Sequence, residues 1–205
     1  RIPMSIKNAP VELEKVVVKF AGDSGDGMQL TGTQFTDTSA LLGNDLATFP
    51  DFPAEIRAPI GTVAGVSGFQ VHIGKVEINT PGDVADVLVA MNPAALKANK
   101  RLIKDGGTII VNSDSFAKKD LQKAGYEENP LENGSFDGYN IVSAPIETLT
   151  RETLKDSGLD GKSIGRSKNM FALGIVYWMF NRPMEQTEKF LKAKFAKNPI
   201  VIESN

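Results

Sequence analysis

Runs of β-branched and apolar residues recur along the chain at intervals that predict the strands of one sheet. Lys15–Ala21 is rich in valine, and Gly65–Ile73 alternates between apolar and polar positions, so both predict strands. Asp86–Met91 and Thr108–Val111 are continuous apolar runs, which are typical of strands covered on both faces. Asn140–Ala144 predicts a further strand.

Helix signals fall between these runs. Leu30, Gln34, Leu41 and Leu42 predict a helix after the first strand, with Gly43 as its stop. After the Asp86 run, Asn92 is a candidate helix cap and Pro93 suits a first turn; we expect a helix over Ala94–Ile103 that Gly106-Gly107 ends. Further helices are predicted at Phe116–Ala124, which Gly125 ends, and in the C-terminal part.

The C-terminal part is predicted to be helical. Ser167 is a candidate cap for a helix running to Phe180 that is apolar on all sides, which suits burial or an interface. After Pro183, a second predicted helix carries Met184, Phe190, Leu191 and Phe195. Strands and helices alternating in this order predict an α/β fold: an open, mainly parallel, Rossmann-like sheet with helices on both faces. We expect one domain over residues 1–205, with residues 1–13 as an irregular lead-in.

Composition excludes several classes of site. The chain has no cysteine, so it can hold no disulfide or thiolate-bound iron–sulfur cluster. Its one histidine, His72, makes a conventional zinc site implausible, and the alternating pattern predicts that this side chain points outward from a strand. The net charge of −2 does not favour nucleic acid or an anionic membrane. The longest apolar stretch is too short to span a bilayer, and we expect a cytoplasmic protein.

The most informative motif is a glycine-rich turn after the first strand: Gly22, Asp23, Ser24, Gly25, Asp26 and Gly27. Such a turn exposes backbone N–H groups at the start of a helix and allows a ligand to approach closely. Its spacing is G-x-x-G-x-G instead of the dinucleotide fingerprint G-x-G-x-x-G, and its two aspartates would repel a pyrophosphate. A tight turn without any ligand is the alternative.

Four more positions are candidates. Glu55 and Arg57 lie in the proline-rich segment 49–59, which we expect to be an ordered loop, and could grip an anion or a neighbouring chain; a solvated surface pair is the alternative. Asn92 and Asn112 follow predicted strands, at the edge where open α/β sheets bind ligands, although the favoured interpretations are a helix cap for Asn92 and a turn former for Asn112. Spacing identifies no catalytic residue and no metal ligands.

The turn Gly22–Met28 resembles the gamma domain of the 2-oxoacid:ferredoxin oxidoreductases. Its aspartates resemble the form fused ahead of the alpha domain in the alpha subunit of 2-oxoglutarate:ferredoxin oxidoreductase. Supporting matches are Phe52–Thr62, Gly68–Ile73, Asp86–Pro93 and Ser167–Gly174. A Tyr-Pro-Ile-Thr-Pro motif expected of the alpha domain is absent, so we expect a fragment of a longer subunit and not a separate gamma-like subunit.

The resemblance implies a domain without activity of its own. The family oxidatively decarboxylates a 2-oxoacid, here expected to be 2-oxoglutarate, on thiamine diphosphate, forms acyl-CoA and passes electrons through iron–sulfur clusters to ferredoxin. Thiamine diphosphate, Mg²⁺ and the clusters are implied to lie on an alpha-type domain and a thiamine-binding beta subunit. This domain would contribute to assembly and to the coenzyme A side of the site through residues 22–27, Glu55, Arg57 and Asn92. The alternatives are an NAD(P)-binding oxidoreductase domain and a ligand-free interaction domain.

Overall fold

A computed structural model describes residues 15–23, 27, 30–35, 45–51, 65–74, 84–180 and 185–204. Its centre is a six-stranded sheet with the strand order β2-β3-β1-β4-β5-β6. The strands are β1 (Lys15–Asp23), β2 (Asp45–Asp51), β3 (Val66–Gly74), β4 (Ala85–Ala90), β5 (Ile103–Asn112) and β6 (Asn140–Ala144). Strands β1, β4, β5 and β6 run parallel, whereas β3 is antiparallel to both β1 and β2. The prediction of an open, mainly parallel α/β sheet is confirmed.

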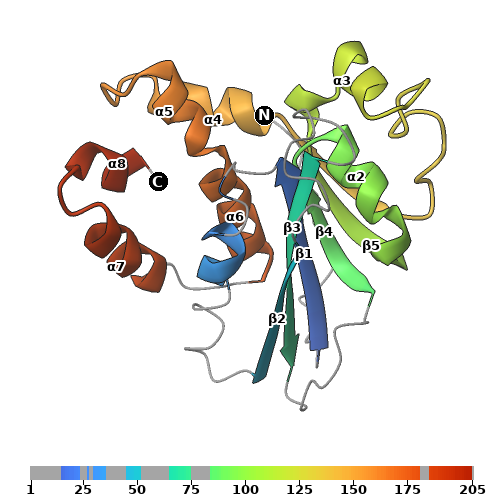
Figure 1. The fold of residues 1–205 in the computed structure, drawn as a ribbon, viewed down its shortest axis with the longest axis horizontal. Helices are drawn as coiled ribbons and strands as arrows, with labels where there is room; N and C mark the ends of the chain where they lie inside the picture. Colours follow the sequence, from blue (N-terminus) through green and yellow to red (C-terminus); the bar gives the residue numbers. More distant parts are fainter. Residues whose placement is uncertain are drawn as a thin grey trace.

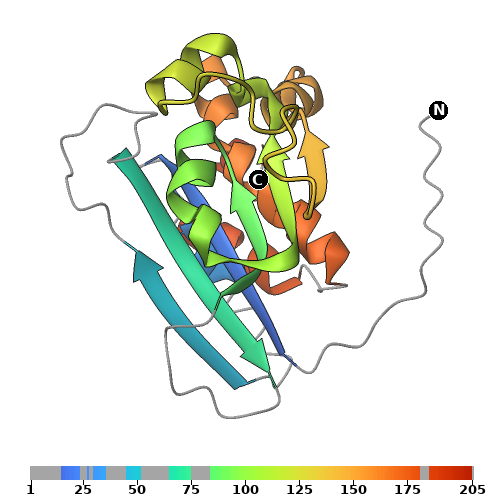
Figure 2. The ribbon, with the colours of Figure 1, turned by 90° about the vertical axis from the view of Figure 1, so that its right-hand side faces the viewer.

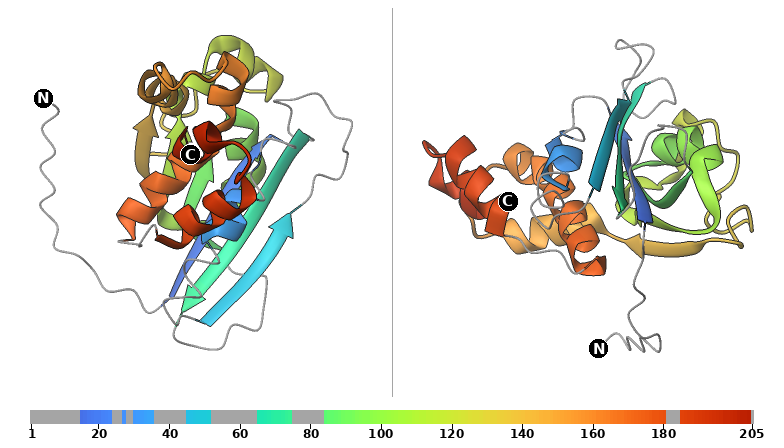
Figure 3. Two further views of the ribbon diagram at one scale, coloured as in Figure 1. Left: turned by 90° about the vertical axis from the view of Figure 1, so that its left-hand side faces the viewer. Right: turned by 90° about the horizontal axis from the view of Figure 1, so that it is seen from below.

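Helices cover both faces of this sheet (Figure 1, Figure 3). On one face lie α2 (Pro93–Asn99), the 3-10 turn η2 (Lys100–Leu102) and α3 (Lys118–Lys123). On the other lie α4 (Ile146–Leu154), α5 (Gly161–Arg166), α6 (Lys168–Met179), α7 (Glu185–Lys194) and α8 (Pro199–Ser204), together with a helical segment at residues 30–35. The 3-10 turn η3 (Ser113–Ser115) follows β5. Figure 2 shows α2 in front of the parallel strands and α3 above their upper ends, with β2 and β3 at the sheet's edge.

Two buried clusters follow from the alternation of side chains along the strands. Val18, Phe20 and Val89 face α6, where they pack with Phe35 and Tyr177. Neighbouring strand positions face α2 and α3 on the opposite side and pack around Leu96, Phe116 and Leu121. Because parallel strands are covered on both faces, nearly every position of β4 is buried, which is why its sequence is apolar throughout.

Several predicted boundaries agree with the structure. Asn140–Ala144 is a strand with the predicted bounds, and β1, β3 and β4 differ from prediction by one or two residues. Asn92 does cap α2: its Oδ1 accepts a hydrogen bond from the backbone N–H of Ala95 at 2.8 Å, and Pro93 stands in the first turn. Gly125 follows α3 with a φ of 71°, the left-handed conformation that glycine adopts most easily.

The prediction that Gly106-Gly107 ends a helix is wrong. The α-helix ends at Asn99, a 3-10 turn follows, and β5 already begins at Ile103, so both glycines lie inside the strand. Gly106 has a φ of 74°, and the register between β4 and β5 shifts nearby, between Ala85 and Val87. A Cβ at Gly107 would lie 2.8 Å from the carbonyl oxygen of Lys104. These glycines permit an irregularity within a strand.

Three other expectations need correction. Residues 49–51 belong to β2 and not to a loop; β2 is the edge strand, where a proline such as Pro50 is tolerated. His72 does not point to solvent: it is fully buried, and its Nε2 lies 2.7 Å from Nε2 of Gln70. β3 has a strand on each side and is covered on the face that carries His72. Ser167 makes no side-chain cap, because its backbone is already helical where α5 leads into α6.

Some expectations fall outside the described residues. These are the later part of the helix after β1 (residues 36–43) and Pro183 with Met184. The lead-in over residues 1–13 also lies there. Among the described residues no helix is both long and apolar enough to cross a membrane.

Candidate functional site at the carboxyl ends of the parallel strands

The topology places a crevice between β1 and β4. After β1 the chain passes through helical residues 30–35 on the α6 face and builds β2 and β3 on one side of β1. After β4 it passes through α2 on the opposite face and builds β5 and β6 on the other side. Where the connections after two adjacent parallel strands pass over opposite faces of the sheet, they leave a crevice at the carboxyl ends of the strands. Open α/β sheets bind ligands in this crevice.

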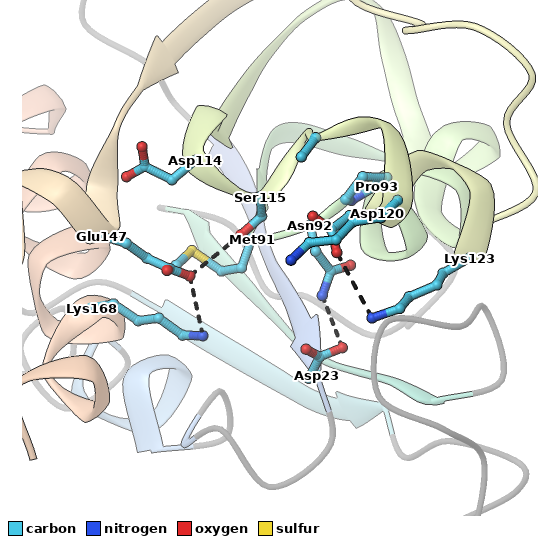
Figure 4. A pocket seen from close by; sticks show the side chains of 12 residues that line it. Asp23, Met91, Asn92, Pro93, Asp114, Ser115, Asp120, Lys123, Glu147 and Lys168 are labelled. Carbon is cyan, nitrogen blue, oxygen red and sulfur yellow. Dashed lines mark hydrogen bonds and ion pairs between the residues drawn. The ribbon is translucent and has the colours of Figure 1, made fainter. Parts of the chain in front are cut away.

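A pocket of about 350 Å³ lies at this position (Figure 4). Asp23 at the end of β1 and Met91, Asn92 and Pro93 after β4 form its floor and one wall. The remaining lining comes from the elements that follow β5 and β6 and from the start of α6: Asp114, Ser115, Ala117, Lys119, Asp120, Lys123, Glu147 and Lys168. Five separate segments of the chain therefore meet here.

Asp23 and Asn92 join the two central strands. Asn92 Nδ2 donates a hydrogen bond to Asp23 Oδ1 at 2.9 Å, while Asn92 Oδ1 holds the first turn of α2. A single side chain thus serves as helix cap and as partner of a carboxylate. Both residues were predicted site residues, and the structure brings them together in one pocket.

A second group of polar side chains connects β5 to α4 and α6. The buried Asn112 donates to Ser115 Oγ at 2.9 Å and accepts from the backbone N–H of Ile146 at 3.1 Å. Lys168 Nζ lies 3.7 Å from Glu147 Oε1, and Ser115 Oγ lies 3.4 Å from the same oxygen. Asn112 therefore supports the pocket wall from behind and does not line the pocket.

The charged side chains of the pocket differ in how far other groups of the protein already bind them. Asp114 accepts from the backbone N–H of Thr148 at 2.7 Å and from its hydroxyl at 3.1 Å. Glu147 faces Lys168 as described above. Lys119, in contrast, forms no ion pair within the described part of the chain, and the pair Lys123–Asp120 is long at 3.9 Å, with the Lys123 side chain 54% exposed. The carboxylates are largely engaged by the protein, whereas the ammonium groups of Lys119 and Lys123 are available to an anion.

The other predicted site residues divide into two groups. Gly22 is the penultimate residue of β1, and Gly27 lies just before the helical residues 30–35 with a φ of 80°. A Cβ at Gly27 would lie 3.8 Å from Asn169 Nδ2, so this end of the turn lies beside the start of α6 and hence near Lys168. Ser24, Gly25, Asp26, Glu55 and Arg57 lie outside the described residues.

The lysines of the pocket were not predicted. All three lysines occur in ordinary helical sequence. Lys119 and Lys123 lie in one segment and Lys168 in a later one, and all three are far from the glycine turn along the chain. The only available signal was positional: α3 follows a predicted strand, and residues after such strands meet at one edge of the sheet. Among the described residues, no group of histidine, aspartate or glutamate side chains is arranged to hold a metal ion.

The fold and this pocket define an open α/β domain with a polar pocket of acidic and basic side chains at a topological switch point. The pyruvate ferredoxin/flavodoxin oxidoreductase family matches residues 17–205, and the chain belongs to that family.

Within this family, the chain is similar to a subunit of a 2-oxoglutarate oxidoreductase. The chain is 54% identical over 193 residues to the 2-oxoglutarate oxidoreductase subunit KorA of Mycobacterium tuberculosis, a match that covers 94% of this chain and 30% of KorA. The chain therefore spans about a third of the length of that curated relative.

Two solved structures have the same fold. The 2-oxoglutarate:ferredoxin oxidoreductase of Magnetococcus marinus, solved with 2-oxoglutarate, coenzyme A and succinyl-CoA bound, superposes with a TM-score of 0.68 at 25% identity, over 94% of this chain and 30% of that one. The gamma subunit of a keto/oxoacid ferredoxin oxidoreductase from Geobacter sulfurreducens PCA gives a TM-score of 0.62 at 19% identity, over 92% and 93% of the two chains. The expected resemblance to this family is confirmed.

Proposed function

We propose that residues 1–205 form a gamma-type domain of a 2-oxoacid:ferredoxin oxidoreductase and that this domain is part of a longer, cytoplasmic subunit. The complete enzyme would oxidise 2-oxoglutarate, transfer the acyl group to coenzyme A and reduce ferredoxin. Family membership supports this proposal, as does 54% identity to a 2-oxoglutarate oxidoreductase subunit over nearly the whole chain. Thiamine diphosphate, Mg²⁺ and the iron–sulfur clusters would be held by an alpha-type domain and a beta subunit.

Within that enzyme, we assign the pocket between β1 and β4 to coenzyme A. The observation that carries this assignment is the combination of a switch-point pocket with two exposed lysines on one wall. Coenzyme A carries three phosphate groups, and lysine ammonium groups bind phosphate as compact point charges. The M. marinus enzyme, which has the same fold over 94% of this chain, was solved with coenzyme A bound.

Each side chain of the pocket has a distinct part in this proposal. Lys119 and Lys123 would contact phosphate oxygens. Asn92 would hold the Asp23 carboxylate in a fixed orientation, so that this acid faces the ligand as a hydrogen-bond acceptor and not as a mobile repulsive charge. The predicted residues Gly22, Ser24, Gly25, Asp26 and Gly27 would contribute backbone, and Glu55 and Arg57 would pair with the ligand or a neighbouring domain.

The proposal is tested by kinetics of the assembled enzyme, prepared from the complete polypeptide and its thiamine-binding partner subunit. We expect ferredoxin reduction that requires both 2-oxoglutarate and coenzyme A, and no turnover by the 205-residue chain alone. Enzyme that fails to reduce ferredoxin with any 2-oxoacid would overturn the assigned activity. Tight binding of NAD(P) would instead indicate a dinucleotide-binding domain.

The coenzyme A assignment has a matched pair of variants on one helix. Lys119 lines the pocket, whereas its neighbour Lys118 does not, and both stand in the first turn of α3. Lys119→Glu should raise the KM for coenzyme A about tenfold, which corresponds to about 1.4 kcal/mol. Its kcat and its KM for the oxoacid should stay unchanged. Lys118→Glu changes the helix in the same way and should leave all three constants unchanged; equal effects of the two variants would contradict the assignment.

A further inference from the structure

One side of helix α6 is buried in the core, and its other side is apolar as well. Its buried residues are Asn169, Ala172, Leu173, Val176 and Tyr177, which recur at the three- and four-residue spacing of a helix face packed on a core. The opposite face carries Phe171, Gly174, Ile175 and Trp178 at the same spacing. A helix with one side in water normally has polar residues there, yet α6 has no charged residue between Asn169 and Phe180.

Among the described residues this outer stripe is only partly covered: Phe171 and Ile175 pack in part against the core cluster, whereas Trp178 does not belong to it. Trp178, the single tryptophan, is 63% exposed, and Phe171 and Ile175 are partly exposed. A Cβ added at Gly174 would meet no atom within 4 Å, so the stripe has an open notch between its larger side chains. Tryptophan is enriched at the centres of protein interfaces, and a glycine notch lets another surface approach the helix backbone.

We propose that the outer stripe of α6, formed by Phe171, Gly174, Ile175 and Trp178, docks a further domain of the same polypeptide. Two observations favour this occupant. First, the relative with 54% identity is about three times as long as the matched region, so a comparable polypeptide carries further domains. Second, the stripe is wholly apolar and uncharged, as in permanent interfaces, and a covalently linked domain keeps it covered from synthesis onward.

The stripe is separate from the pocket assigned to coenzyme A. Of the residues of α6, only Lys168 at its first position lines that pocket, and Trp178 lies near the other end of the helix. The inference therefore does not depend on ligand binding, and it can fail while the proposed function holds. A second copy of this chain and a separately encoded subunit are the competing occupants.

Hydroxyl-radical footprinting with mass spectrometry measures the exposure of Trp178 directly. The complete polypeptide, without its partner subunit, should oxidise Trp178 roughly fivefold more slowly than the 205-residue chain, because a tryptophan at the centre of an interface is shielded from water. Leu102, which is 40% exposed on the opposite face of the sheet, serves as the control and should be labelled equally in both.

A variant extends the test. Gly174→Arg fills the notch but points into open space, so it should leave the 205-residue chain folded while restoring Trp178 oxidation in the complete polypeptide. Leu102→Arg should restore nothing. Equal oxidation of Trp178 in both proteins would overturn the proposal. Protection that appears only on adding the partner subunit, or that rises with the concentration of the 205-residue chain, would overturn it in favour of one of the competing occupants.

Discussion

The hydrogen bond between Asn92 and Asp23 allows a quantitative test of the site's construction. Asn92 is 8% exposed and uses both ends of its amide: Oδ1 caps α2, and Nδ2 donates to the Asp23 carboxylate at 2.9 Å. Asn92→Asp keeps an acceptor for the cap but directs a second carboxylate at the first. Asn92→Ser also keeps a cap, although its shorter side chain makes no contact with Asp23.

The two variants should differ in how far they lower the free energy of unfolding. A hydrogen bond to a charged group contributes about 1.5–3 kcal/mol, and losing it in Asn92→Ser should cost about the lower figure because Asp23 is partly exposed. Two like charges about 4 Å apart repel by roughly 4 kcal/mol at an effective dielectric constant near 20. Since Asp23 can turn toward solvent, we expect Asn92→Asp to lower the free energy of unfolding by about 2–3 kcal/mol at neutral pH.

Exchanging the residues at positions 23 and 92 should restore the hydrogen bond between them. In the double variant Asp23→Asn with Asn92→Asp, residue 23 donates the hydrogen bond and residue 92 accepts it, so the free energy of unfolding should return to within about 1 kcal/mol of the original. Urea unfolding followed by circular dichroism measures the original chain, Asn92→Ser, the single variants Asp23→Asn and Asn92→Asp, and the double variant. A double variant as unstable as the sum of its single variants would refute the direct hydrogen bond.

The Asn92→Asp variant should also acquire a dependence on pH. Two adjacent carboxylates cannot both ionise easily, so the folded state raises the pKa of one of them above its unfolded value. The folded state then binds more protons than the unfolded state, and stability increases as the pH falls through that raised pKa. A destabilisation that is the same at pH 7 and in mild acid would argue against repulsion as its cause.

Three further measurements test other parts of the structure. Gly125→Ala should lower the free energy of unfolding by about 1 kcal/mol or more, because φ is 71° and the new Cβ would lie 2.9 Å from Lys97 Nζ. Gly165→Ala lies in a helix with open space around it, so it should leave this free energy unchanged or raise it by up to about 1 kcal/mol. Urea unfolding compares the two variants. Burial raises the pKa of Tyr126 to about 12, so its contribution to stability is present below about pH 10 and is lost as the pH rises toward 12. Tyr126→Phe should remove this loss in alkaline unfolding and a step near pH 12 in the tyrosinate absorbance titration. Asp160→Ala should destabilise α5 and lower the melting temperature, because Asp160 Oδ1 accepts from the backbone N–H of Ser163 at 2.8 Å; thermal unfolding measures this.

Local signals in the sequence were sufficient for much of the fold. The apolar run of β4 is sufficient to predict a strand buried on both faces, and Asn92 with Pro93 predicts the start of α2, because capping depends on neighbours within one helical turn. The glycine after α3 is predicted for the same reason. At the site, the strand ends Asp23 and Asn92 could be predicted because parallel strands present their carboxyl ends at one edge.

Other features were decided only by tertiary structure. Whether Gly106-Gly107 ends a helix or bends a strand depends on the pairing of β5 with β4, and the burial of His72 depends on β3 lying between two strands. Lys119 and Lys168 lie in different helices, so only the packing of α3 and α6 around the strand ends brings them to one pocket. Sequence determined the elements through short-range chemistry, whereas contacts between residues far apart in the chain determined the charges of the pocket and the exposed side of α6.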